Sequence, residues 1–139
     1  MSDVMKVLII ENEPVARLLL EKQIRAFGFD VSVCTNGESG LEAYNQMFYP
    51  LIVVDMGLPD VYGLDFCRQI RTMPRGERSV ILVITERYDN GYLQALIEAG
   101  ADSYLTKPVS MEILKMHLKV VKRQWGILSN RVIKEASLA

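Results

Sequence analysis

Five short apolar segments, rich in β-branched residues, constrain the fold of this chain more than any other feature. They are Met5–Ile10, Val31–Cys34, Leu51–Val54, Val80–Ile84 and Ser103–Leu105. Their length and composition are typical of strands that are buried on both faces, as in a parallel sheet. Between them, apolar residues recur at helical spacing. The pattern predicts a strand–helix unit repeated five times, and right-handed crossovers then give an α/β fold with an open parallel sheet.

Size and charge narrow the class of protein. The 139 residues suit one domain, and an apolar fraction of 50% is enough for a sizeable core. A net charge of −1 gives no overall attraction to nucleic acid or to an anionic membrane. No apolar run approaches the ~20 residues of a membrane span, and no signal-peptide pattern is present. Cys34 and Cys67 have no metal-ligand spacing, which favours buried free thiols. We expect a cytoplasmic protein that binds neither nucleic acid nor membrane.

Polar side chains follow the predicted strands at the points where most of them end. They are Glu11, Asn12, Asp55, Thr85 and Lys107. Ligands of open α/β sheets bind outside the carboxyl ends of the strands, so these side chains are expected to meet at one rim. The second strand ends without a reactive side chain, as expected for the edge of the sheet. The sequence therefore predicts a functional site at this rim.

The residues at the rim are suited to phosphoryl transfer. Asp55 is a nucleophile that can form an aspartyl phosphate, and such transfer depends mainly on positioning and on neutralising charge. A hard cation, most plausibly Mg²⁺, would be held by Asp55, by the strand-one pair Glu11-Asn12 and by the backbone carbonyl of Gly57. Lys107 would add a second positive charge, and the Thr85 hydroxyl can donate a hydrogen bond to a phosphoryl oxygen.

Four segments resemble the signature blocks of response-regulator receiver domains from two-component signalling. They are VLIIENEP, VVDMGLPDVYG, ILVIT and YLTKP. The combination of Asp-x-x-Leu-Pro-Asp-x-x-Gly at 55–63 with Lys-Pro at 107–108 is specific, and the resemblance covers about residues 5–125. It implies a flavodoxin-like (βα)5 fold with strand order 2-1-3-4-5. We therefore expect a receiver domain over residues 1–125.

The resemblance also implies a role for each site residue. Asp55 would be the phosphorylation site, Thr85 the switch hydroxyl, Tyr104 the switch aromatic and Lys107 the phosphoryl-contacting lysine, with a cis bond before Pro108. The donor would be a phosphohistidine on a histidine kinase or a phosphotransfer protein. The chain would be no enzyme but a phospho-acceptor that assists its own phosphotransfer and dephosphorylation and then changes conformation. Simple packing of a half-buried Tyr104 remains the alternative to its switch role.

Three residues depart from the family pattern. The strand-one pair is normally two aspartates, whereas here Glu11 is longer and Asn12 is uncharged. Glu86 stands after Thr85, where a small residue is usual. A phosphorylation-independent docking module with an impaired metal site is therefore the alternative function. Asn12 before Glu13-Pro14 also predicts a helix N-cap, either in addition to a metal contact or in its place.

Residues 126–139 are predicted to form a C-terminal helical extension or linker. A heptad-like set of apolar residues continues into them: Leu114, Leu118, Val121, Trp125, Leu128 and Val132. The last three lie beyond the usual end of a receiver and have no obvious core to enter. Gly126 costs a helix about 1 kcal/mol, which leaves a frayed tail as the alternative. An ordered extension would pair two chains as a homodimer or lead to an output domain.

Overall fold

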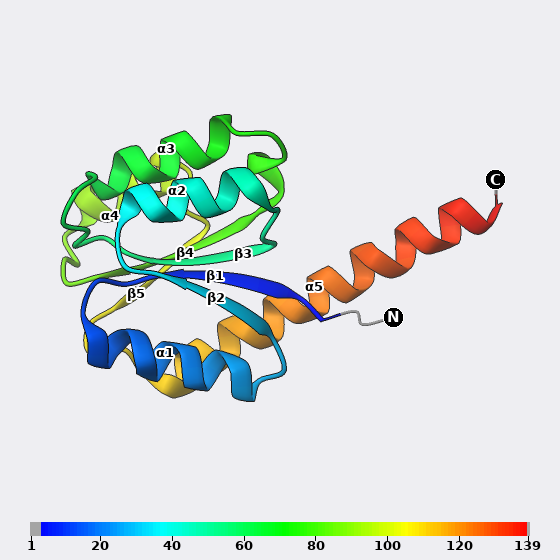
Figure 1. Ribbon diagram of the computed structural model, residues 1–139, viewed down its shortest axis with the longest axis horizontal. Helices are drawn as coiled ribbons and strands as arrows, with labels where there is room; N and C mark the ends of the chain where they lie inside the picture. The colour runs from blue at the N-terminus through cyan, green and yellow to red at the C-terminus, as the bar shows by residue number, and fades with distance from the viewer. Residues whose placement is uncertain (1–3, 139) are drawn as a thin grey trace.

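A parallel sheet of five strands forms the centre of the protein (Figure 1). The computed structural model describes residues 4–138, and the side chains through residue 126. The strand order is β2-β1-β3-β4-β5, and every neighbouring pair is parallel. The strands are β1 (Lys6–Ile10), β2 (Asp30–Cys34), β3 (Leu51–Asp55), β4 (Val80–Thr85) and β5 (Ser103–Thr106). The predicted fold class and strand order are confirmed.

Helices cover both faces of the sheet. They are α1 (Pro14–Ala26), α2 (Gly37–Gln46), α3 (Gly63–Thr72), α4 (Asn90–Ala99) and α5 (Met111–Leu138), with a short 3₁₀ turn at Gly76–Arg78. Helices α1 and α5 lie on one face, and α2, α3 and α4 lie on the other (Figure 1). Each face has its own apolar core, because successive side chains of a strand point to opposite sides. In β3, for example, Val53 packs toward α1 and α5, whereas Val54 packs toward the other helices.

The structure corrects the predicted N-cap of α1. Pro14 is the first residue of the helix, so the capping position falls on Glu13 and not on Asn12. The Glu13 carboxylate accepts hydrogen bonds from the backbone N–H groups of Val15 at 3.1 Å and of Ala16 at 2.7 Å. Asn12 lies one residue earlier, at the exposed edge of the site. Its side chain is therefore free of the capping role.

Helix α5 continues to Leu138 and leaves the body of the protein (Figure 1). Before it does so, Trp125 packs against the core between the sheet and α1, so the expectation that Trp125 has no core to enter is wrong. Lys122 holds the same stretch, because its ammonium donates to the Phe27 carbonyl at 3.2 Å and lies over the Phe27 and Phe29 rings. The side chains of Leu128 and Val132 lie outside the described part of the chain. The division of the chain after residue 125 stays a prediction.

The two cysteines differ in their surroundings. Cys67 is buried, as predicted, and burial raises the pKa of its thiol to about 11. Cys34 is only half-buried, because β2 is an edge strand, and burial raises the pKa of its thiol as well. Both thiols are free. Across residues 4–138, no helix combines the length and the apolar character that a bilayer crossing requires.

Candidate functional site

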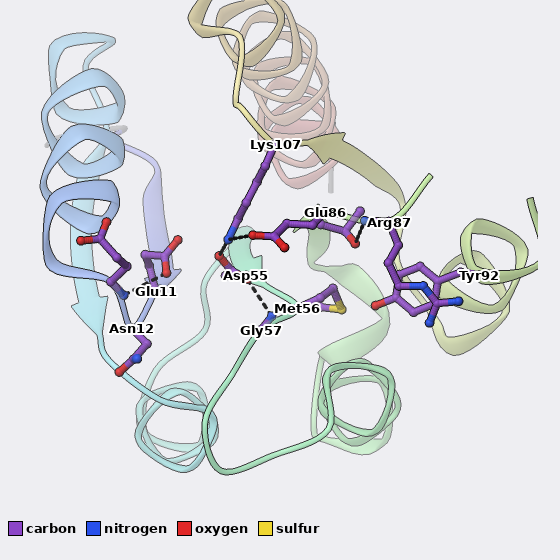
Figure 2. Close-up of a pocket in the computed structure, with 11 residues that line it drawn as sticks. Glu11, Asn12, Asp55, Met56, Gly57, Glu86, Arg87, Tyr92 and Lys107 are labelled. Carbon is purple, nitrogen blue, oxygen red and sulfur yellow. Dashed lines mark hydrogen bonds and ion pairs between the residues drawn. The ribbon is translucent and has the colours of Figure 1, made fainter. Parts of the chain in front are cut away.

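An open cleft of about 350 Å³ lies at the carboxyl ends of β1, β3, β4 and β5 (Figure 2). Its lining consists of Glu11, Asn12, Glu13, Asp55, Met56, Gly57, Thr85, Glu86, Arg87, Tyr92 and Lys107. The structure thus brings together every residue that the strand ends and the predicted metal site pointed to. Tyr104, implied by the resemblance alone, does not line the cleft. The parallel arrangement explains the convergence, since all strand ends of one polarity reach the same rim.

Asp55, the last residue of β3, lies at the floor of this cleft and is only 3% exposed. Its Oδ1 accepts the backbone N–H of Gly57 at 2.7 Å, and its Oδ2 lies 2.5 Å from the Lys107 ammonium. Among the described residues, no group makes a hydrogen bond of ordinary geometry to Oδ2. A carboxylate oxygen has two lone pairs, so Oδ2 keeps the capacity to bind a further electrophile or cation.

Lys107 follows β5 and is the cation nearest to Asp55, and the bond between Lys107 and Pro108 is cis, as the resemblance implies. Partial burial lowers the pKa of Lys107, but the carboxylates of Asp55, Glu11 and Glu86 outweigh burial and raise it above its ordinary value. The lysine is therefore charged at neutral pH. One ammonium thus faces several carboxylates in the cleft.

The strand-one pair divides between the inside and the outside of the cleft. Glu11 is buried, and its Oε2 accepts the backbone N–H of Glu13 at 3.1 Å. Burial and the neighbouring Asp55 carboxyl raise the pKa of Glu11 to about 7, although the Glu13 N–H and Lys107 act in the opposite direction. Asn12 is exposed, and Figure 2 shows its amide directed away from Asp55. Arg17 fixes the backbone of the pair by donating to the carbonyls of Glu11 and Asn12, each at 3.1 Å.

Of the four carboxylates that line the cleft, Glu11 and Asp55 are buried, whereas Glu13 and Glu86 are exposed. Within residues 4–126, no group of three or more His, Cys, Asp and Glu side chains is placed to hold a metal ion. Glu11 and Asp55 converge, but the third position of the predicted set carries the outward-facing amide of Asn12. Among residues 4–126, no further buried carboxylate supplies the negative charge that an aspartate at residue 12 would carry.

Thr85 ends β4 and is buried at the wall of the cleft. Its Oγ1 accepts the backbone N–H of Arg87 at 3.1 Å. Burial raises the pKa of Tyr92, and a side-chain hydrogen bond with Thr85 opposes that rise, so Tyr92 is the nearby partner of the Thr85 hydroxyl. Tyr104 lies on β5, is 37% exposed and stands outside the cleft. The hydroxyl of the implied switch thus lines the cleft while the aromatic ring does not, and the switch role of Tyr104 stays a prediction.

The mouth of the cleft contains Glu86, which departs from the family pattern, together with Arg87 and Tyr92. Glu86 is 78% exposed, and its carboxylate lies 4.0 Å from the Lys107 ammonium. Arg87 turns to the other side, where its guanidinium lies 4.1 Å from the centre of the Tyr92 ring and pairs with Asp89 at 3.1 Å. Tyr92 was not predicted as a site residue. Its place in the first turn of the helix after β4 is the signal that points to it, since that turn faces the same rim.

Comparisons with known proteins agree with this geometry. The family model of the response regulator receiver domain matches residues 7–119. The chain is 33% identical to response regulator ArlR of Staphylococcus saprophyticus over 119 residues, which are 86% of this chain and 53% of that protein. It therefore spans about half the length of that relative. It is 26% identical to the probable chemotaxis protein CheY of Rhizobium etli, over 86% of this chain and 94% of that protein.

One solved structure adds a similarity at the level of the fold. The receiver domain of the sensor histidine kinase PA1611 from Pseudomonas aeruginosa has a TM-score of 0.77 and 26% identity, over 88% of this chain and 98% of that chain. That structure is described with a magnesium ion coordinated in its active site cleft. The family match covers most of the chain, and the observed strand order and cleft agree with it. The chain therefore belongs to the response-regulator receiver domains of two-component signalling.

Proposed function

We propose that Asp55 accepts a phosphoryl group from the phosphohistidine of a histidine kinase or a phosphotransfer protein. The observation that carries this proposal is the state of Asp55 Oδ2, which is buried at the floor of an open cleft and has the Lys107 ammonium beside it. The other oxygen, Oδ1, is held by the Gly57 N–H. Oδ2 is accordingly the oxygen that attacks.

In the proposed transfer, Asp55 Oδ2 forms a bond to phosphorus while the phosphorus–nitrogen bond of the donor breaks. The electron pair of that bond stays on the imidazole, which then takes a proton. Lys107 neutralises charge on the phosphoryl oxygens, and the Thr85 hydroxyl donates a hydrogen bond to one of them. The same groups assist the later hydrolysis of the aspartyl phosphate, so the chain acts as a self-assisting acceptor.

The cleft also supports Mg²⁺ as the cofactor. Two buried carboxylates, Glu11 and Asp55, share the cleft with one ammonium, and Asp55 Oδ2 has unused acceptor capacity. Glu11, Asp55, the Gly57 carbonyl and, after a side-chain rotation, Asn12 would hold the ion. When bound, it would supply positive charge to the phosphoryl oxygens. Because Asn12 adds no charge, we expect binding weaker than in a receiver with two aspartates in the strand-one pair.

Helix α1 offers a surface for the donor protein beside the cleft. Val15, Leu18 and Leu19 are each at least 49% exposed. An apolar groove of about 380 Å³ lies between the start of α1 and the segment that joins β5 to α5, and it also borders Glu11 and Lys107. An apolar face next to the reacting carboxylate suits a protein donor better than a small anion.

Phosphorylation is proposed to act through Thr85 and Tyr104 and to reach α5. A phosphoryl group of about −2 charge would draw Thr85 toward it, and Tyr104 would then move from its exposed position into the space that Thr85 vacates. The output would pass through α4, β5 and α5. The length of α5 beyond the body supports an output domain or a homodimer as the receiver of the signal (Figure 1).

A second candidate function is a docking module that works without phosphorylation. It is favoured by the outward direction of Asn12 and by the absence of a third acidic ligand among residues 4–126. Incubation with a phosphodonor and Mg²⁺, followed by intact mass, separates the two functions. We expect one base-labile phosphate on the wild-type chain and none on Asp55→Asn. No label from any donor would favour the docking module, and full labelling of Asp55→Asn would refute the assignment of Asp55.

A further inference from the structure

Asp60 connects the loop after β3 to the start of α2. Its carboxylate accepts two backbone hydrogen bonds, from Gly37 at 2.8 Å and from Glu38 at 2.9 Å. These N–H groups belong to the first two residues of α2, more than 20 positions earlier in the chain. The hydrogen bonds, that from Glu38 foremost, hold the pKa of Asp60 below its ordinary value. Asp60 is therefore an anion at neutral pH, at a helix end that favours negative charge.

The start of α2 does not need Asp60 as its ordinary cap. Asn36 already occupies the capping position, and its side chain accepts the Ser39 N–H at 2.8 Å. Asp60 reaches α2 because Gly37 has no side chain, since a Cβ there would lie 2.8 Å from Val61 and 3.3 Å from Asp60 Oδ1. The missing side chain at Gly37 thus lets the loop after β3 come close to α2. The hydrogen bonds of Asp60 then fix the position of that loop.

The fastened segment, residues 56–62, is the same one that carries Gly57 into the cleft. At its start, the Met56 N–H donates to the Ile84 carbonyl at 2.9 Å, and the Gly57 N–H donates to Asp55 Oδ1 at 2.7 Å. At its end, Gly63 lies so close to Met56 that a Cβ would come within 2.5 Å of the sulfur. Asp60 fixes the middle of the segment between these two points.

We propose that Asp60 is a positioning residue of the phosphorylation site, which acts by holding Gly57 in place. Loss of the two hydrogen bonds to α2 frees the middle of the 56–62 segment, and Gly57, which lines the cleft, then loses its fixed position against Asp55. The inference rests on the proposed function insofar as the Gly57 carbonyl is a ligand of Mg²⁺. The fixed position of the Gly57 amide against Asp55 holds independently of that role.

The test compares Asp60→Ala and Asp60→Asn with the control Asp65→Ala in the full chain. Asp65 is an exposed carboxylate in the first turn of α3 that pairs with Arg68 at 3.0 Å. Amide NMR spectra are recorded while Mg²⁺ is added, and labelling by acetyl phosphate is timed at limiting and at saturating Mg²⁺. For Asp60→Ala we expect the Kd for Mg²⁺ to rise about fivefold, as for the loss of one net hydrogen bond. The Gly57 resonance should also shift before any Mg²⁺ is added, and Asp60→Asn, which keeps one acceptor oxygen, should lie between.

The outcomes separate positioning from simple capping. If Asp60→Ala lowers the Tm but leaves the Gly57 resonance at its wild-type position and the Kd for Mg²⁺ within twofold of that of Asp65→Ala, Asp60 only caps α2. The inference is then overturned. If the wild-type chain takes no label and binds no Mg²⁺, the proposed function fails, while the Gly57 resonance in metal-free protein still decides the role of Asp60. Should Asp60→Ala not fold, the same measurements on Asp60→Asn decide it.

Discussion

Replacing Asn12 with aspartate should strengthen the binding of Mg²⁺ about tenfold, equivalent to about 1.4 kcal/mol. The substitution changes an amide to a carboxylate of nearly the same shape, so the fold need not adjust. It restores a second acidic residue to the strand-one pair, next to the buried Glu11. Because Glu13 and not residue 12 caps α1, the change leaves the start of that helix intact.

The magnitude follows from where residue 12 lies. Two unit charges about 4 Å apart interact by about 1 kcal/mol in water and by about 4 kcal/mol at an effective dielectric constant of 20. Residue 12 is exposed, so the value for water applies, and a doubly charged cation then gains about 2 kcal/mol. Screening by salt and the rotation of the side chain into the cleft reduce this gain. A buried position would have given a larger effect, which makes the tenfold value specific to this structure.

Isothermal titration calorimetry of metal-free protein with Mg²⁺ measures the change. Asn45→Asp is the matched control, since Asn45 is exposed on α2, does not line the cleft and gives the same change in net charge. We also expect Asn12→Asp to have a lower Tm than the wild type without Mg²⁺, because three carboxylates then repel one another, and to recover it when Mg²⁺ is added. An affinity within twofold of the wild type would show that residue 12 does not contact the ion.

Three further changes test other parts of the site. Glu86→Ala should speed labelling by acetyl phosphate severalfold but transfer from a protein donor little, because its carboxylate lies 4.0 Å from Lys107 at the open mouth of the cleft; equal acceleration for both donors would remove the electrostatic argument. Arg17→Met should lower the free energy of unfolding by about 1–2 kcal/mol and weaken Mg²⁺ binding, because two backbone carbonyls of the strand-one pair lose their donor. Urea unfolding measures the first effect and calorimetry the second, and an unchanged Mg²⁺ affinity would show that Arg17 contributes to stability alone. Truncation after Gly126 keeps Trp125 in its core contact, so it should leave the Tm unchanged but abolish any dimer that the full chain forms with a phosphate mimic. If light scattering finds monomers for both chains with and without the mimic, the extension has no role in pairing.

The central strands and the rim of the cleft follow from the sequence because local patterns decide them. A strand buried on both faces must be apolar at nearly every position, as β3 is up to its last residue, and the residue that ends such a run is at the carboxyl end of the sheet. The positions of Asp55, Thr85 and Lys107 at the rim therefore follow from local sequence alone. The direction of the crossovers then determines which ends meet.

Other features depend on contacts between distant parts of the chain, which local patterns do not specify. Asn12 and Glu13 are both able to cap a helix, and the choice depends on where the chain turns from β1 into α1, which begins at a proline. The packing of Trp125 depends on how α5 lies against α1. The link from Asp60 to Gly37 spans 23 residues and needs the absence of one Cβ on the other segment. No periodicity in the sequence reports any of these contacts.

The route of α5 out of the body has a mechanical consequence. Lys122 and Trp125 clamp the helix to α1 and the sheet, and Gly126 follows directly. A Cβ on Gly126 would meet no described atom within 4 Å, so packing within that part of the chain does not require a glycine there. Glycine weakens a helix by about 1 kcal/mol relative to alanine, and the next 12 residues form an arm about 18 Å long. Gly126 therefore makes α5 easier to bend directly beyond the part that Lys122 and Trp125 hold in place. A rotation of that part would be passed on to residues 127–138 only through the helical turn that contains Gly126.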